Sequence, residues 1–179
     1  TIISRMTPVE EGAGYYVHLQ NGRLQVNLVK RWLDDAIRVE SHDPVPLNQW
    51  CHIAVVYDGS RVAAGIKVYL DGRLVPMDVK LDRINQTFAA TTEPVRIGSG
   101  QSSFVGSVDD VRLYNRDLSS AEAGILSVSL TVSEILTVAE NARNAGQRNK
   151  LTQYFLNTLA PAEIRDAHQS LVQLQRVRR

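Results

Sequence analysis

Hydrophobic and polar residues alternate through much of the first 100 residues, with the period of two that is typical of half-buried β-strands. Asn21-Gly22 and Asp71-Gly72 each separate two alternating runs. Such dipeptides tolerate the positive φ angles of a tight hairpin turn. The alternation predicts strands over residues 15–19, 24–28, 36–40, 66–70, 73–75 and 95–98. We expect residues 76–94 to form a loop with one irregular strand.

Two further stretches, residues 50–57 and 105–114, are apolar on both faces. This pattern is typical of a central strand that is covered on both sides. It predicts that Trp50 and Tyr114 are core residues and that Cys51 is a buried, inert thiol. Short strands with turns every 8 to 12 residues indicate an antiparallel β-sandwich.

The period changes to that of helices near the end of the sandwich pattern. Ser119-x-x-Glu122 and Thr131-x-x-Glu134 are capping boxes, in which two side chains satisfy free amides at a helix start. Residues 144–146 suggest a helix stop, and residues 151–159 suggest a second short helix with an apolar face. Pro161 then suits the first turn of a third helix. Its apolar residues repeat with heptad spacing at Ile164, Ala167, Leu171 and Leu174.

We therefore expect a sandwich over residues 1–126, a helical connection over 127–148 and a helical linker over 149–179. The heptad seam is about two heptads long, which is too short to predict a coiled coil. We expect its apolar residues either to dock on the sandwich or to bind a neighbouring domain. The chain opens on Thr1 without a signal peptide or an initiating methionine. We expect it to be a fragment of a larger protein.

The charge balance and the single cysteine narrow the function classes. Lys and Arg total 20 and Asp and Glu total 19, which does not favour nucleic acid as a partner. No apolar run approaches the roughly 18 residues of a membrane span. One cysteine allows neither an intrachain disulfide nor a Cys-x-x-Cys-His haem attachment.

Four motifs in order resemble the laminin-G-like branch of the concanavalin-A-like lectin and glucanase sandwiches. They are Trp50-x-His52-x-Ala54-Val55-x-Tyr57-Asp58-Gly59-Ser60, Tyr69-Leu70-Asp71-Gly72, Val95-Arg96-Ile97-Gly98, and Gly106-x-Val108-Asp109-Asp110-Val111-Arg112-Leu113-Tyr114 with Asn115-Arg116-x-Leu118-Ser119-x-x-Glu122. The resemblance implies a mainly β fold, a concanavalin-A-like jelly roll, with a C-terminal helical segment. Members of the family have a further, tryptophan-bearing strand before the position matched by residues 1–3. We expect that strand to be missing here, leaving an edge exposed.

A narrower resemblance concerns the sandwich found within large planctomycete-type multidomain proteins with cytochrome-c-like domains. It rests on Trp32-Leu33-x-x-Ala36-Ile37-Arg38-Val39, Ala63-Ala64-Gly65, Leu151-x-x-Tyr154-Phe155 and residues 165–174. It implies a periplasmic or extracellular parent protein, whose neighbouring domains are partners of this chain.

Glucanases of this fold carry carboxylates at Glu-x-Asp-x-x-Glu spacing, which places the acid and the nucleophile on one face of a strand. This chain has no such string. Asp109 and Asp110 are adjacent and point to opposite faces of a strand. Asp110 with Arg112 is better explained as a structural pair. We expect a protein that is not an enzyme.

Calcium is the metal that the resemblance leaves open, because relatives of this fold hold it in loops through Asp, Asn and backbone oxygens. The loop candidates here are Asp34, Asp35, Asp58 and Asp82. The four histidines, His18, His42, His52 and His168, are scattered without metal-binding spacing. We expect no cofactor, with calcium as the possible exception.

Sugar recognition requires an exposed aromatic ring that stacks on the sugar, with planar polar groups beside it. Trp32, in a polar connection with Arg31, Asp34 and Asp35, is the best candidate. His42 and Tyr16 join this ligand-binding set if the strands bring them near. The alternative is that Trp32 packs over a sheet end and fixes the loop. Two hypotheses remain: a lectin-like module that binds a polysaccharide or other glycan, and a structural domain that packs against neighbouring domains.

Overall fold

The computed structural model describes residues 1–10, 12–85 and 92–177. The chain forms two compact units, which are described separately. The first consists of Thr1–Cys51, Val55–Val68 and Leu74–Asp117, and the second of His52–Ala54, Tyr69–Arg73 and Leu118–Arg179.

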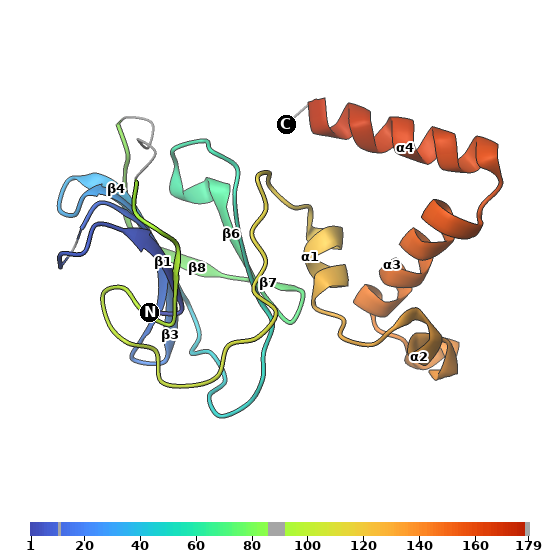
Figure 1. Cartoon of the computed structure of the whole chain (residues 1–179), viewed down its shortest axis with the longest axis horizontal. Coiled ribbons are helices and arrows are strands. Elements are labelled where there is room, and N and C mark those ends of the chain that lie inside the picture. The colour runs from blue at the N-terminus through green and yellow to red at the C-terminus, as the bar shows by residue number, and fades with distance from the viewer. Residues whose placement is uncertain (11, 86–91, 178–179) are drawn as a thin grey trace. The chain divides into compact units, whose positions relative to one another are not determined.

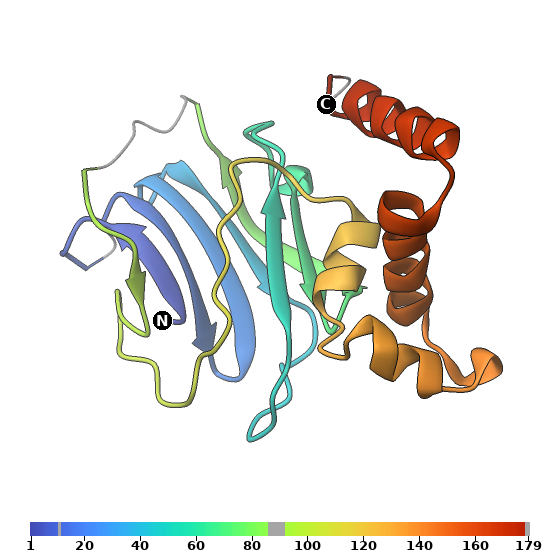
Figure 2. The same cartoon turned by 45° about the vertical axis from the view of Figure 1, so that its right-hand side comes forward.

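The strands form two antiparallel sheets, as the alternation predicts (Figure 1). The larger sheet has six strands in the order β8-β4-β3-β2-β1-β9, and its strands are seen side by side in Figure 2. Their bounds are β1 Ile3–Met6, β2 Gly14–Gln20, β3 Arg23–Arg31, β4 Asp35–Ser41, β8 Met77–Arg83 and β9 Arg96–Ile97. The smaller sheet has the order β5-β6-β7, with β5 Ile53–Tyr57, β6 Ile66–Leu70 and β7 Arg73–Val75. The predicted mainly β sandwich with C-terminal helices is confirmed.

Both predicted hairpin turns are present. Asn21 and Gly22 have φ angles of 51° and 77°, and Asp71 and Gly72 have 47° and 76°. Two successive residues at positive φ match the twist of the strands that they join. The first turn sets the register of β2 against β3, with Gln20 opposite Arg23. Every pair further along these two strands follows from it.

The larger sheet buries one face as the hydrophobic core. On this inner face, β2, β3 and β4 contribute alternate apolar residues: Val17, Leu24, Val26, Leu28, Ile37 and Val39. Asp82 lies on the same face, opposite Ile37, and its carboxylate accepts a hydrogen bond of 2.8 Å from the Ala63 amide. Ala63 begins the short helix η1 (Ala63–Gly65) that runs into β6. The inner face is therefore the face turned toward the smaller sheet.

The predicted central strand over residues 105–114 is wrong. Of the described residues between 98 and 119, none belongs to a strand. Val105 is 95% exposed and Tyr114 is 45% exposed, so Tyr114 is not a core residue. Asp110 has a φ of +50°, which interrupts an extended backbone. The predicted pair is confirmed, because Arg112 donates two hydrogen bonds of 2.7 and 2.8 Å to the Asp110 carboxylate.

The predicted buried strand over residues 50–57 is shorter than expected. It begins at Ile53, after the positive φ of Asn48 has redirected the chain, and it lies at an edge of its sheet. Trp50 precedes the strand and is 70% exposed, so it is not a core residue. Cys51 is half-buried rather than buried.

The stretch over residues 76–94, expected to be a loop with one irregular strand, contains the seven-residue strand β8. The irregularity of β8 is a register shift, which lies between Arg38 and Val39 of its partner β4. Residues 86–91 of that stretch lie outside the described residues.

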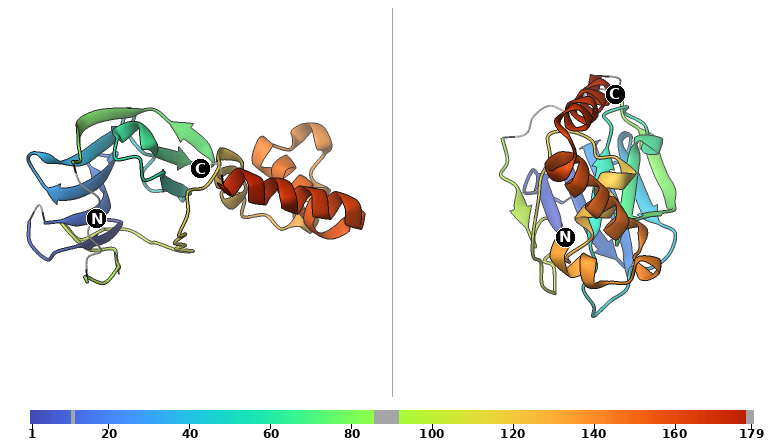
Figure 3. Two further views of the ribbon diagram at one scale, coloured as in Figure 1. Left: turned by 90° about the horizontal axis from the view of Figure 1, so that it is seen from above. Right: turned by 90° about the vertical axis from the view of Figure 1, so that its right-hand side faces the viewer.

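The second unit contains the α-helices (Figure 3). They are α1 Ser120–Leu126, α2 Val132–Thr137, η2 Glu140–Ala142, α3 Ala145–Tyr154, the π turn η3 Phe155–Leu159 and α4 Ala162–Val177. Both predicted capping boxes form. The predicted stop at Asn144 is wrong, because the Asn144 side chain accepts from the Gln147 amide and caps the start of α3. The predicted third helix is confirmed as α4, and its seam residues Ile164, Leu171 and Leu174 are exposed.

Candidate functional site

The larger sheet carries a second, more polar face opposite the core, which we call the outer face. Cα pairing aligns one residue from each strand across it: Arg96, Ser4, Tyr16, Asn27, Arg38 and Leu81. We call this alignment the central row. Because side chains alternate along each strand, all six lie on the same face. Five of the six carry polar atoms in their side chains, and Leu81 on β8 is the apolar member of the row.

Trp32 packs onto the outer face from the turn between β3 and β4. It contacts a small cluster of buried residues formed by Met6, Tyr16, Val29 and Ala36. Its indole is nearly parallel to the Tyr16 ring, at 13° with 6.4 Å between centroids. The Arg38 guanidinium lies 4.0 Å from the indole centroid, a cation–π contact, and its Nη2 donates to the Trp32 carbonyl at 3.3 Å. Trp32 is therefore half-buried and joins an aromatic and cationic group on one sheet face.

Two neighbours in the central row lack partners for buried polar atoms. Asn27 is fully buried, and among the described residues neither its Oδ1 nor its Nδ2 has a hydrogen-bond partner. The Nε of Arg38, which is paired with Asn27 across the strands, is also buried without a partner in the described part of the chain. A buried amide without a hydrogen bond destabilises a fold by about 1–3 kcal/mol. Such groups are typical of sites that serve a function.

The adjacent row of the outer face contains a complete chain of hydrogen bonds. His18 Nε2 lies 2.8 Å from Gln25 Oε1, Gln25 Nε2 donates to Glu40 at 2.5 Å, and Lys80 lies 3.1 Å from the other Glu40 oxygen. Burial lowers the pKa of His18 below its usual 6.5, although the hydrogen bond to Gln25 opposes this. The Gln25 hydrogen bond and Lys80 lower the pKa of Glu40. On the outer face, the buried polar atoms of Asn27 and Arg38 therefore contrast with the paired side chains of this adjacent row.

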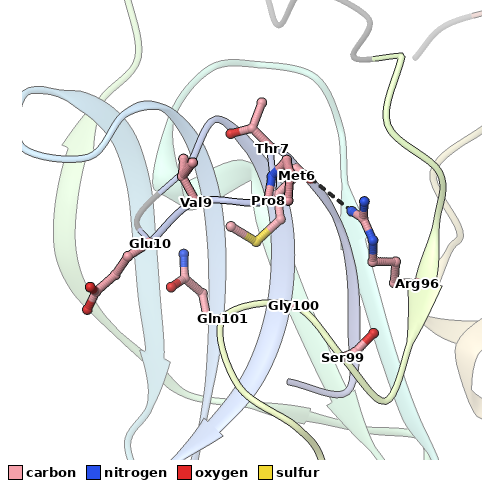
Figure 4. A pocket seen from close by; sticks show the side chains of 9 residues that line it. All are labelled: Met6, Thr7, Pro8, Val9, Glu10, Arg96, Ser99, Gly100 and Gln101. Atoms are coloured by element: carbon pink, nitrogen blue, oxygen red, sulfur yellow. Dashed lines mark hydrogen bonds between the residues drawn. The ribbon is translucent and has the colours of Figure 1, made fainter.

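A pocket of about 550 Å³ lies at the β1 and β9 side of the outer face (Figure 4). It is lined by Met6, Thr7, Pro8, Val9, Glu10, Arg96, Ser99, Gly100 and Gln101. Arg96 is held by its hydrogen bond to the Met6 carbonyl at 3.0 Å and by an ion pair with Glu93 at 2.8 Å. Met6 also belongs to the buried cluster under Trp32, so the pocket and the Trp32 group share this residue.

The structure brings together two of the six predicted ligand-binding residues, Trp32 and Tyr16. Arg31 and Asp34 pair with each other at 3.1 Å on the exposed turn. Asp35 is buried and accepts from the Asn85 amide at 3.0 Å. His42 follows the far end of β4, four residues beyond Arg38, and lies 3.3 Å from Asp78. The expected proximity of His42 to Tyr16 is therefore not found.

The four candidate calcium ligands do not converge in the structure. Asp34 pairs with Arg31, Asp35 accepts from Asn85, Asp82 accepts from Ala63, and Asp58 accepts from the Ser60 amide at 2.8 Å. Across residues 1–10, 12–85 and 92–177, no three His, Cys, Asp or Glu side chains form a group that could hold a metal. These four carboxylates are therefore not brought together in the described part of the chain, and calcium binding stays a prediction.

The sequence prediction missed Asn27 and Arg38. Both residues could have been found from the polar positions of β2, β3 and β4, which alternate with the apolar positions that predict these strands. With the register fixed by the Asn21-Gly22 turn, Tyr16 must face Asn27. The neighbouring hairpin is less predictable, because its register shifts between Val29 and Arg31.

No helix of the described residues combines the length and the hydrophobicity that crossing a membrane requires. A family model described as "Concanavalin A-like lectin/glucanases superfamily" matches residues 1–124, which confirms the predicted family. The narrower planctomycete resemblance stays a prediction. No curated protein sequence matches the chain. A solved structure that matches is the 2.1 Å crystal structure of residues 221–444 of an S-layer domain-containing protein from Clostridium thermocellum ATCC 27405, with 20% identity and a TM-score of 0.38. The match covers 72% of this chain and 64% of that one.

Proposed function

This chain belongs to the concanavalin A-like lectin/glucanases superfamily, and we propose that it is a non-catalytic module that binds a saccharide on the outer face of its larger sheet. The observation that carries the proposal is the group formed by Trp32, Tyr16 and Arg38. An indole beside polar groups on a sheet face is what stacking on a sugar ring requires. The pocket shares Met6 with the cluster under Trp32, which supports the same side of the sheet as the binding surface.

The superfamily contains lectins as well as glucanases, so membership leaves both activities open. The absence of the Glu-x-Asp-x-x-Glu string supports the non-catalytic alternative. We further propose that the module belongs to a larger protein that acts outside the cytoplasm, and that the module positions that protein on a polysaccharide. Calcium is not required by this proposal, since the ring and the polar row supply the contacts.

The two tryptophans provide a matched test. Trp32 lies in the proposed site, whereas Trp50 is exposed before β5. Screening the chain on a glycan array should identify bound saccharides, and isothermal titration should then give their affinities. We expect Trp32→Ala to reduce affinity at least tenfold and Trp50→Ala to leave it unchanged. No binding to any glycan, or equal effects of the two substitutions, would reject the proposal.

Fluorescence gives an independent readout of the same site. In a Trp50→Phe variant, Trp32 is the remaining tryptophan. A saccharide that stacks on its ring should shift the emission with the same midpoint as the heat signal. An emission unchanged at saturating ligand would place binding elsewhere on the chain.

A second candidate function is protein interaction, and the second unit favours it. Large apolar side chains are exposed on its helices: Leu136, Tyr154, Phe155, Leu159, Ile164, Leu171 and Leu174. Exposed apolar surface of this extent is typical of binding surfaces. If the chain binds no saccharide but associates with a neighbouring domain of its parent in a pull-down, and Leu171→Asp abolishes the association, the interaction role is the better explanation.

A further inference from the structure

We propose that the saccharide bound by the outer face carries an anionic ring substituent, a carboxylate or a sulfate ester, that binds Arg38 and Asn27. This inference rests on the proposed function and adds the chemical class of the ligand. It starts from Asn27, whose fully buried amide has two polar atoms without partners among the described residues.

Among the described residues, Arg38 lacks the carboxylate partner that three other arginines of the first unit have. Arg31 pairs with Asp34, Arg96 with Glu93, and Arg112 with Asp110, each at 3.1 Å or less. Within the part of the chain that the structure describes, Arg38 has no such carboxylate. Its contacts are the Trp32 ring and the Trp32 carbonyl, and its Nε is buried without a partner. A half-buried guanidinium that lacks a counter-charge attracts an anion.

Asn27 and Arg38 present complementary donors side by side. They face each other on β3 and β4, where the Cβ atoms of paired residues lie about 4.5–5.5 Å apart. An anionic group between them would accept from Arg38 Nε and Asn27 Nδ2, and a sugar hydroxyl would donate to Asn27 Oδ1. Charge-assisted hydrogen bonds of this kind are about twice as strong as neutral ones.

Access requires the turn of residues 32–34 to open. Opening breaks the Trp32 contacts with Tyr16 and Arg38, whereas the tip of the turn is already in solvent, with Leu33 81% exposed and the Arg31–Asp34 pair exposed. When Trp32 lifts away, the ligand fits between the indole and the central row. The sugar ring then stacks on the indole of Trp32, and its anionic substituent binds Arg38 and Asn27.

The probes are oligogalacturonate, its methyl ester and dextran sulfate, each titrated against the whole chain at constant ionic strength. The ester keeps the sugar chain and removes the charge. We expect oligogalacturonate, dextran sulfate or both to bind at least tenfold more tightly than the ester. Comparing the two acidic probes shows whether the site recognises a carboxylate or a sulfate ester. Arg38→Gln should remove this preference, corresponding to a loss of roughly 10- to 100-fold in affinity.

Lys80→Gln is the matched control. It removes one positive charge near the same face, but Lys80 is already paired with Glu40. We expect less than a threefold effect. An equal loss from both substitutions would mean that binding reflects general charge and would overturn the inference. Asn27→Asp provides Arg38 with a carboxylate from the chain itself, so it should also abolish the preference for acidic saccharides over the ester. This variant tests the inference if Arg38→Gln does not fold.

The outcomes separate this inference from the proposed function. If the ester and neutral cello-oligosaccharides bind as well as the acidic probes and Trp32→Ala abolishes all binding, the saccharide site stands and the anionic inference fails. If no saccharide binds at all, both fail. Retention of acidic preference in Arg38→Gln and in Asn27→Asp would also overturn the inference.

Discussion

Replacing Asn27 by leucine tests whether the central row sacrifices stability for ligand binding. Asn27 is fully buried, and its amide has no hydrogen-bond partner among the described residues. Leucine is similar in size and has no polar atoms to desolvate. We therefore expect Asn27→Leu to stabilise the fold.

The expected magnitude follows from the buried amide. Burying an unpaired amide destabilises by about 1–3 kcal/mol, and imperfect packing of the new side chain offsets up to about 1.5 kcal/mol of the gain. The net increase in the free energy of unfolding is then about 1 kcal/mol. For a chain of this size it corresponds to a rise of about 2–4 °C in Tm.

Urea unfolding followed by Trp32 fluorescence, in a Trp50→Phe background, measures the effect close to Asn27. Gln25→Leu is the control, because it places the same side chain on the same face of β3. Gln25 bridges His18 and Glu40, so its loss leaves both without that partner and should destabilise by about 1–3 kcal/mol. The two substitutions should thus have opposite signs.

A decrease of 1 kcal/mol or more for Asn27→Leu would refute the reasoning, since it would mean that the amide is paired in the folded protein. The variant should also lose the preference for acidic saccharides. Higher stability combined with lost binding is the expected signature of a functional site that is strained in the free protein.

Three further predictions concern the fold around the site. Gly14→Ala should destabilise by more than about 3 kcal/mol by urea unfolding, because its φ is +139° and an added Cβ would lie 2.2 Å from the Arg5 carbonyl oxygen; wild-type stability would contradict the close packing of β1 on β2. Ser119→Ala should lower stability by about 1 kcal/mol through loss of the α1 N-cap, measured by helical circular dichroism, whereas Ser119→Asp should retain the cap and most of the signal. Burial lowers the pKa of His18 in the folded protein, so as the pH falls the unfolded chain takes up this proton at a higher pH than the folded chain. The contribution of His18 to the free energy of unfolding is therefore complete above pH 6.5 and is lost as the pH falls through the folded pKa. Unfolding curves at several pH values should show that His18→Gln loses less stability at acid pH than the unchanged protein does. The same pH dependence of stability in both proteins would show that His18 is not buried.

The sequence by itself determined the elements whose causes are local. Asn21-Gly22 and Asp71-Gly72 specify their hairpins because both residues of each turn tolerate positive φ. Ser119 and Thr131 start their helices because a side-chain oxygen and a glutamate three residues later satisfy the first free amides. The period-two alternation of β2, β3 and β4 likewise gave the sandwich and its core face.

Only the tertiary structure decided which alternating segments pair and which polar residues meet. The stretch over 105–114 has the pattern of a central strand, yet the positive φ of Asp110 and its ion pair with Arg112 leave it without a ladder. Trp32 follows β3 in an ordinary turn, and its packing on Tyr16 and Arg38 depends on the register of three strands. Local sequence sets backbone angles and side-chain alternation, whereas partners across strands depend on contacts between residues far apart in the chain. For this reason the sequence could suggest Trp32 and Tyr16 as candidate site residues, and the fold was needed to add Asn27 and Arg38 to the candidate site.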